Sequence, residues 1–287
     1  MLCKYPITVN GTVVGCGQCI HCRSNRRREW VHRILLEMKC HEFNTFLTLT
    51  YDDEHLPADG SLVPEHLTKF FKRLRTNTKL KIRYYAVGEY GEETERPHYH
   101  VALFGYPNCN YGRTRSKPLC CTACTNIKKT WRMGNVYLGE LNEHSATYTA
   151  GYILKKLTKA DDPILDGRYP EFARMSKKPA LGRTFVDDIA EQLKKHHAKE
   201  VPFFLQHGTK KMPLDNYLRN EISKQTNLPK QKKKQINVRP LYQTEEIVQA
   251  PRPLKTLLIE HSISDTEKYK RQSIERHQKR KLRSKHI

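Results

Sequence analysis

The sequence contains no long run of apolar residues. A helix that crosses a membrane needs about 20 consecutive, mostly apolar residues, and no stretch of this chain approaches that length. The beginning of the chain also lacks the basic and then apolar segment that is typical of a secretory leader. These absences exclude a protein built on membrane-spanning helices. We expect a soluble protein that stays in the compartment where it is made.

Acidic residues are scarce relative to basic ones. The 287 residues include 52 Lys and Arg but only 30 Asp and Glu, which gives a formal net charge of +22. Such a charge predicts a polyanionic partner, nucleic acid first and an acidic membrane surface second. The tail over 223–287 is especially rich in basic residues, and we expect it to be partly disordered. It either faces nucleic acid or keeps the protein soluble.

The nine cysteines are an odd number, and they are clustered at short spacings. In a chain that is not secreted, this pattern favours metal ligands or free thiols over disulfides. The first cluster comprises Cys3, Cys16, Cys19 and Cys22, and the second comprises Cys109, Cys120, Cys121 and Cys124. The Cys-x-x-Cys spacing is typical of structural zinc sites, with an iron–sulfur cluster as the alternative.

The grouping of these ligands stays open at the level of sequence. Cys3, His21 or a distant residue would complete a zinc site with the cysteines at 16, 19 and 22. Cys109 or Cys120 would join the pair at 121 and 124 in the same way. The two clusters therefore form either two zinc sites or one shared site.

Two histidines lie two residues apart on a predicted strand. Residues 97–105 are rich in aromatic and aliphatic side chains and are bounded by Pro and Gly, so we expect a buried strand. His98 and His100 then project from the same face, as two core histidines or as a metal clamp. Strand 81–90 precedes this one across a short polar loop, which predicts an antiparallel hairpin. Glu89 would complete a two-histidine, one-carboxylate metal site, with Glu92, Glu93 or Glu95 as alternatives in the loop.

Two tyrosines lie four residues apart in a predicted helix that Asn142 or Ser145 begins and that runs to about residue 157. The spacing puts Tyr148 and Tyr152 on one helical face, where tyrosines are most often packing residues. A phenol has a pKa of about 10 and is a weak nucleophile, but a nearby cation lowers that pKa. Lys155 and Lys156 follow one turn later and are further candidates for catalysis.

The rest of the pattern predicts an order of elements and four segments. We expect a helix over 23–40, with Ser24 as its cap and a basic face that meets phosphates or solvent. That face comprises Arg23, Arg26, Arg27, Arg28 and Arg33. Further strands are predicted over 43–51 and 134–139, and a helix begins at Pro64. The predicted segments are a cysteine-rich segment with the basic helix (1–42), a core (43–160), an accessory helical segment (161–222) and the basic tail (223–287).

Three motifs in this order resemble the HUH endonucleases. His98-Tyr99-His100 is similar to their histidine pair, Phe46-Leu47-Thr48-Leu49-Thr50-Tyr51 to their first motif, and Tyr148-Thr149-Ala150-Gly151-Tyr152 to their two-tyrosine third motif. The likeness is strongest to the replication initiators of small single-stranded DNA phages of the microvirus (gokushovirus-like) type. Further points of likeness are Cys16-Gly17-Gln18-Cys19, Gly88-Glu89-Tyr90-Gly91 and residues 48–57.

The resemblance implies an α+β fold: a central antiparallel sheet in a split βαβ arrangement, with helices on one face. It implies an enzyme in which Mg²⁺ or Mn²⁺ at Glu89, His98 and His100 activates a phosphate of DNA. Tyr148 or Tyr152 then forms a 5′-phosphotyrosine and frees a 3′-hydroxyl that primes rolling-circle replication. The implied partners are a circular single-stranded origin and a host helicase and polymerase in the bacterial cytoplasm. No membrane and no small-molecule substrate are expected.

Two other classes stay open. A zinc-stabilised nucleic-acid-binding protein without catalysis would explain the charge and the cysteines, but not Glu89, the histidine pair and the tyrosines. A plasmid initiator, conjugative relaxase or transposase would use the same chemistry, although many such enzymes have a single tyrosine. Covalent attachment to a nicked strand separates the binding protein from the enzymes.

Overall fold

The computed structural model describes residues 3–91, 94–110, 120–155, 165–207 and 209–231. The chain divides into two compact units. One comprises residues 1–22, 162–166 and 232–287, and the other comprises 23–161 and 167–231. The expected tail past residue 231, Glu92, Glu93 and Lys156 lie outside the described residues.

The described part of the first unit is a small β-hairpin that leads into a helix. Strands β1 (Ile7–Val9) and β2 (Thr12–Val14) pair antiparallel around Asn10 and Gly11. Both turn residues have positive φ, 48° and 73°, which is the backbone that an Asn-Gly turn adopts most readily. Helix α1 (Ile20–Lys39) then begins four residues before Ser24, so the predicted cap at Ser24 is wrong.

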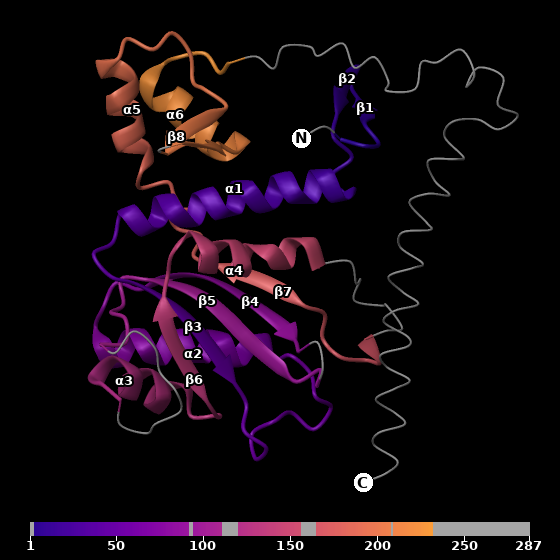
Figure 1. The fold of residues 1–287 in the computed structure, drawn as a ribbon, viewed down its shortest axis with the longest axis vertical. Coiled ribbons are helices and arrows are strands. Elements are labelled where there is room, and N and C mark those ends of the chain that lie inside the picture. Colours follow the sequence, from indigo (N-terminus) through magenta and orange to yellow (C-terminus); the bar gives the residue numbers. More distant parts are fainter. Residues whose placement is uncertain (1–2, 92–93, 111–119, 156–164, 208, 232–287) are drawn as a thin grey trace, which may run out of the picture. The chain divides into compact units, whose positions relative to one another are not determined.

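The second unit is built on a five-stranded antiparallel sheet with the strand order β6-β3-β5-β4-β7 (Figure 1). Its strands are β3 (Asn44–Thr50), β4 (Arg83–Tyr90), β5 (Pro97–Phe104), β6 (Val136–Glu140) and β7 (Phe172–Met175). Strands β3 and β4 both pair antiparallel with β5, which lies between them. Helix α2 connects β3 and β4, so this part of the sheet is a split βαβ unit. The prediction missed β7, a short strand at the edge.

Helices α2 (Pro64–Thr78) and α3 (Thr122–Trp131) cover one face of this sheet. Pro64 stands in the first turn of α2, where a missing N–H costs nothing, and Lys79 ends the helix in the left-handed conformation. The helices bury aromatic side chains against Tyr99 and its neighbours on the sheet. Residues packed in this core include Leu67, Phe70, Phe71, Leu74, Ile127, Trp131, Leu47, Leu49, Val101 and Leu103.

The opposite face of the sheet is covered by α1 and α4 (Glu143–Lys155). Val31 and Ile34 of α1 and Ala146 and Ala150 of α4 pack against Tyr85, Val87, Ala102 and Phe104 of the sheet. The expectation of helices on one face is therefore wrong. The reason is that α1 is not a surface helix with a wet basic side, because its other side is also buried.

A satellite subdomain covers that other side of α1 (Figure 1). It consists of α5 (Val186–Lys195), β8 (Phe204–His207), β9 (Lys210–Pro213) and α6 (Asn216–Thr226). The two predicted helical segments here are present, whereas the β8–β9 hairpin was not predicted. Leu36 of α1 joins the apolar cluster formed by Val186, Ile189, Val201, Leu214, Leu218 and Ile222.

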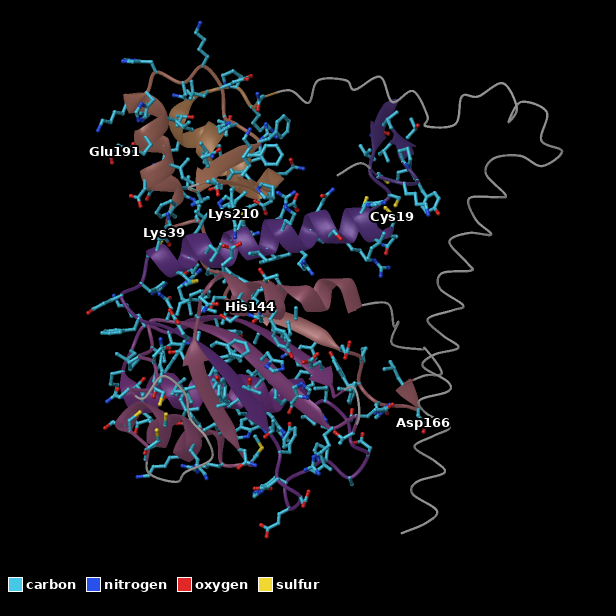
Figure 2. All side chains as sticks on the ribbon, viewed as in Figure 1. Cys19, Lys39, His144, Asp166, Glu191 and Lys210 are labelled. Carbon is cyan, nitrogen blue, oxygen red and sulfur yellow. The ribbon has the colours of Figure 1, made fainter. Side chains whose placement is uncertain are left out.

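Polar side chains connect α1 to the satellite subdomain. Arg33 was predicted to face phosphate or solvent, but it is buried and pairs with Asp215 at 3.0 Å. Lys210, labelled in Figure 2, pairs with Glu143 at the start of α4, with 2.8 Å between the ammonium nitrogen and the carboxylate. His32 is completely buried. Its Nδ1 lies 2.8 Å from the Pro213 carbonyl and its Nε2 lies 2.9 Å from His207 Nε2.

We predict that His32 makes this protein less stable at mildly acidic pH. Burial lowers the pKa of His32 to about 4, so the folded chain stays unprotonated where the unfolded chain binds a proton. A depressed histidine pKa costs stability as the pH falls below the unfolded value of about 6.5, and the loss levels off near the folded value. Between pH 7.5 and pH 5 the expected cost is about 2 kcal/mol.

Urea unfolding at both pH values would measure this cost. His32→Gln should shrink the stability difference between pH 7.5 and pH 5 by about 2 kcal/mol. His144→Gln, at an exposed position on α4, is the matched control and should keep the full difference. An equal pH dependence in all three proteins would refute the assignment to His32.

Candidate metal centre and tyrosine helix

Glu89, His98 and His100 are brought together by the register of the β4–β5 hairpin. Glu89 lies directly opposite His98, and His100 follows on the same face of β5. The Glu89 Oε1 atom is 2.8 Å from His98 Nε2 and 2.9 Å from His100 Nε2. The three candidate ligand atoms lie within 4.8 Å of one another. The alternative at Glu95 pairs with Arg168 at 3.0 Å instead.

Both imidazoles are held from behind, so that their Nε2 atoms point to the same place. His98 Nδ1 lies 3.0 Å from the carbonyl oxygen of Arg96, and His100 Nδ1 lies 2.9 Å from Thr48 Oγ1 on β3. With Nδ1–H as the donor in each contact, Nε2 keeps its lone pair for a cation. The Phe46 ring lies nearly parallel to His100, at 10° with 5.6 Å between ring centroids.

Burial and hydrogen bonding act against each other in this cluster. Burial would raise the pKa of the Glu89 carboxyl, but hydrogen bonds from His100 and His98 outweigh it and hold the pKa below its usual range. Burial would lower the pKa of His98, but the Glu89 carboxylate and the Arg96 carbonyl raise it above its usual value. The cluster thus combines a buried anion with two imidazoles, a donor set that suits Mn²⁺, Fe²⁺ or Zn²⁺.

Helix α4 begins with a reciprocal cap that fixes its position next to the sheet. Ser145 N–H donates to Asn142 Oδ1 at 3.0 Å, and Asn142 N–H donates to Ser145 Oγ at 2.8 Å. The small side chains of Ala146 and Ala150 are completely buried on the sheet side, one turn apart. They allow the helix to approach β4 and β5 closely.

Tyr148 of α4 stands beside the cluster and is open to solvent. Its phenol oxygen lies 3.4 Å from His100 Nε2, and its side chain is 45% exposed. The ring meets His100 edge to face, with centroids 5.0 Å apart. The backbone of Tyr152 lies one turn later in α4, as does that of Lys155, but both side chains lie outside the described residues.

Three positioning residues were not identified from the sequence as part of the site: Phe46, Thr48 and Arg96. The guanidinium of Arg96 bonds Asp53 Oδ1 at 2.7 Å and the Tyr51 carbonyl at 3.2 Å. These bonds hold the segment whose carbonyl orients His98. Thr48 faces His100 directly across the β3–β5 pair, which no spacing within either strand reveals.

The candidate zinc ligands fall into two separate groups of four. Cys3, Cys16, Cys19 and Cys22 form one, without His21, and Cys109, Cys120, Cys121 and Cys124 form the other. Among the described residues, no helix is long and apolar enough to cross a membrane.

The sequence is similar to replication-associated proteins of several viruses. The sequence model of the replication-associated protein ORF2 family matches residues 44–158. Replication-associated protein ORF2 of Spiroplasma virus 4 is 33% identical over 262 residues, which cover 84% of this chain and 80% of that protein. Replication-associated protein VP4 of Bdellovibrio phage phiMH2K is 36% identical over 186 residues, 62% of this chain and 58% of that protein.

A third relative is replication-associated protein ORF4 of Chlamydia phage 1, which is 31% identical over 192 residues, 63% of this chain and 47% of that protein. No solved structure matches the chain. The likeness to the first relative extends over most of both proteins, so it is not confined to the sheet. The chain belongs to the ORF2 family of replication-associated proteins.

Proposed function

We propose that this protein initiates rolling-circle replication by cutting single-stranded DNA and joining itself to the 5′ end. The observation that carries the proposal is the position of Tyr148, an exposed phenol 3.4 Å from one of two histidines that share a buried carboxylate. A nucleophile next to a cation site is the arrangement that phosphoryl transfer requires. Membership of a replication-associated family and a net charge of +22 support DNA as the substrate.

Glu89 Oε1 and the two Nε2 atoms would hold a divalent cation, with the remaining coordination positions left for water and a phosphate oxygen. When bound, Mg²⁺ or Mn²⁺ would polarise the phosphate and stabilise the charge that develops on its oxygens. The imidazoles favour Mn²⁺ over Mg²⁺ in affinity. Thr48 and the Arg96 carbonyl keep both rings in the ligating orientation.

In the proposed step, the Tyr148 oxygen bonds to phosphorus and the bond from phosphorus to the 3′ oxygen breaks. The phenolic proton is lost to solvent or to a basic side chain, and the departing oxygen takes up a proton to become a free 3′-hydroxyl. One phosphodiester is exchanged for another, so no nucleotide cofactor is consumed. Attack by a 3′-hydroxyl on the phosphotyrosine reverses the step and rejoins the strand.

Tyr152 follows Tyr148 by one helical turn, and we propose that the two alternate. One tyrosine keeps the 5′ end of the displaced strand while the other cuts the next copy of the origin. Lys155 and Lys156 would neutralise the attacking phenol or the leaving oxygen. A host polymerase would extend the 3′-hydroxyl in the bacterial cytoplasm, with a host helicase opening the duplex.

We predict that Tyr148→Phe combined with Tyr152→Phe abolishes covalent attachment to DNA and leaves binding intact. The substitution removes only the attacking oxygens, whereas binding depends on basic charge. The measurement uses a labelled circular single strand of the virus genome, Mn²⁺ and denaturing gels. Tyr137→Phe is the matched control, since Tyr137 is an exposed tyrosine on β6, and it should still form the adduct.

An adduct that survives in the double variant would place the nucleophile elsewhere. Salt-sensitive binding without any adduct in the native protein would favour a non-catalytic DNA-binding protein. An adduct on the origin of a plasmid or transposon, but not on a phage origin, would indicate a different user of the same chemistry.

We predict that Glu89→Gln lowers the nicking rate about 100-fold or more at a fixed Mn²⁺ concentration. The amide keeps the size of the side chain but removes the charge that holds the cation. Chelation of the native protein should stop nicking, and added Mn²⁺ should restore it. Circular dichroism must show an unchanged fold in Glu89→Gln, and an unchanged rate in that folded variant would remove Glu89 from the site.

We predict that Thr48→Val weakens the cation site without destroying the reaction. Removing the partner of a ligating imidazole usually costs about 10- to 100-fold in metal affinity. The Mn²⁺ concentration for half-maximal nicking should rise by that factor, while saturating Mn²⁺ restores most of the rate. Thr50→Val is the control, because Thr50 lies on the same strand and face but contacts the Asn135 carbonyl at 3.4 Å. Equal Mn²⁺ dependence in both variants would contradict a positioning role for Thr48.

A further inference from the structure

We propose that the chain holds two independent structural zinc ions, each bound by four cysteines, and that the second supports the sheet that carries the metal centre. The eight ligands are Cys3, Cys16, Cys19 and Cys22 in site A and Cys109, Cys120, Cys121 and Cys124 in site B. The two sets lie in different compact units of the chain. Each set already contains the four ligands of a closed tetrahedral site, so neither needs a donor from the other.

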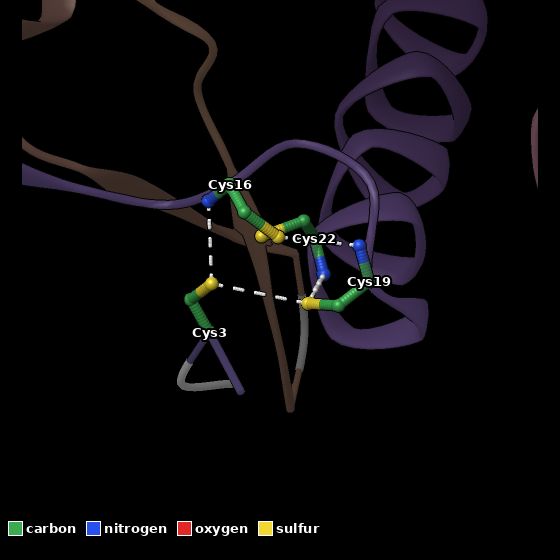
Figure 3. A group of neighbouring side chains, drawn as sticks. All are labelled: Cys3, Cys16, Cys19 and Cys22. Atoms are coloured by element: carbon green, nitrogen blue, oxygen red, sulfur yellow. Dashed lines mark hydrogen bonds between the residues drawn. The ribbon is translucent and has the colours of Figure 1, made fainter. Parts of the chain in front are cut away.

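The sulfur spacing in site A fits an ion at the centre (Figure 3). Its four sulfur atoms lie within 4.8 Å of one another, and Cys3 Sγ is 3.9 Å from Cys19 Sγ. Four thiolates around zinc at about 2.3 Å are separated by about 3.8 Å, whereas a disulfide brings two sulfur atoms to about 2.05 Å. The spacing therefore matches ligation and not a disulfide.

The backbone around site A is shaped to surround a cluster of thiolates. Amide N–H groups donate to sulfur from Cys16 to Cys3 at 3.3 Å and from Cys19 to Cys16 at 3.3 Å. Gly17 has a φ of +75°, which turns the chain between these cysteines at little cost. A Cβ atom at Gly15 would lie only 3.1 Å from Cys22 Sγ, so a larger residue would press on the cluster.

Site B has the same donor set on a different frame. Cys121 stands at the cap position of α3 and Cys124 lies in its first turn, while Cys109 comes from the segment after β5. The Sγ atoms of Cys109 and Cys120 are 3.4 Å apart, as are those of Cys121 and Cys124. The start of a helix favours negative charge, so two thiolates there are stabilised by the helix dipole.

Site B is connected to the strands of the metal centre through the buried core. Cys109 and Cys124 belong to the same apolar core as Trp131, at the other end of α3. The indole N–H of Trp131 donates to the Thr50 carbonyl at the end of β3, at 2.9 Å. The Trp131 ring also packs against Tyr99, which lies between the two histidines on β5. An ion that fixes α3 therefore holds the back of the sheet on whose front the histidines lie.

The count of bound metal ions tests the proposal in the full chain. Plasma mass spectrometry after removal of loosely held metal should find two zinc ions per chain. Cys3→Ser with Cys19→Ser should lose one ion, and Cys121→Ser with Cys124→Ser should lose the other. Cys40→Ser is the matched control and should keep both, because Cys40 lies outside both sets and its thiol donates to the Leu36 carbonyl. The count is repeated in Glu89→Gln, so that an ion at the catalytic centre is recognised separately.

The two pairs of substitutions should differ in a second measurement. Hydrogen exchange should speed up over residues 122–131 and 44–50 when site B is lost, but not when site A is lost. Faster exchange over both ranges after loss of site A alone would overturn the supporting role of site B.

Several results would overturn the proposal. One ion that both pairs of substitutions remove would mean a shared site, iron with acid-labile sulfide would mean an iron–sulfur cluster, and no ion at all would mean free thiols. Where a variant does not fold, cobalt titration of the native chain decides. Two equivalents should produce sulfur-to-cobalt absorption, and saturation at a single equivalent refutes two sites. None of these readouts depends on DNA cleavage.

Discussion

The pairing of β4 with β5 is the constraint on which the candidate site depends. Because Glu89 is placed directly opposite His98, the carboxylate reaches both imidazoles from the neighbouring strand. A shift of one residue would turn either the acid or the histidines to the other face of the sheet. The register is fixed by eight consecutive residue pairs from Arg83 opposite Phe104 to Tyr90 opposite Pro97. Metal ligation here is therefore a property of the hairpin as a whole.

The covering of both faces gives each side of the sheet its own task. Tyr99 points to the apolar side, where its hydroxyl meets Tyr51 at 2.8 Å and its ring meets Trp131. His98 and His100 point to the other side, where α4 leaves room for the exposed ring of Tyr148. Tyr99 thus anchors the strand on one face while its neighbours are presented on the other. Alternation along one strand makes the rigid support and the accessible site compatible.

Local patterns predicted the parts of the fold that depend on neighbours in sequence. The strands, α2 and the hairpin follow from periodicity and a short loop, and the hairpin brought Glu89 close to the histidines. The contact of Thr48 with His100 was not predictable, since it depends on which strand becomes the second neighbour of β5. The burial of Arg33 was missed for a similar reason: only the satellite subdomain, far along the chain, supplies Asp215. The division of the cysteines into two sets also required distances that spacing alone does not contain.

Two buried carboxylates among the described residues show how structural and functional acids differ in this chain. Glu37 is compensated permanently: Arg83 pairs with it, His41 Nε2 lies 3.0 Å away and the Gly182 amide donates at 2.7 Å. Glu89 instead faces two imidazoles, whose lone pairs bind a proton or a cation in exchange. An arginine cannot give up its place in this way, because it stays charged at any physiological pH. The acid whose partners are exchangeable is the one suited to an ion that must also bind substrate, which is why the burial of Glu89 argues for function and that of Glu37 for stability.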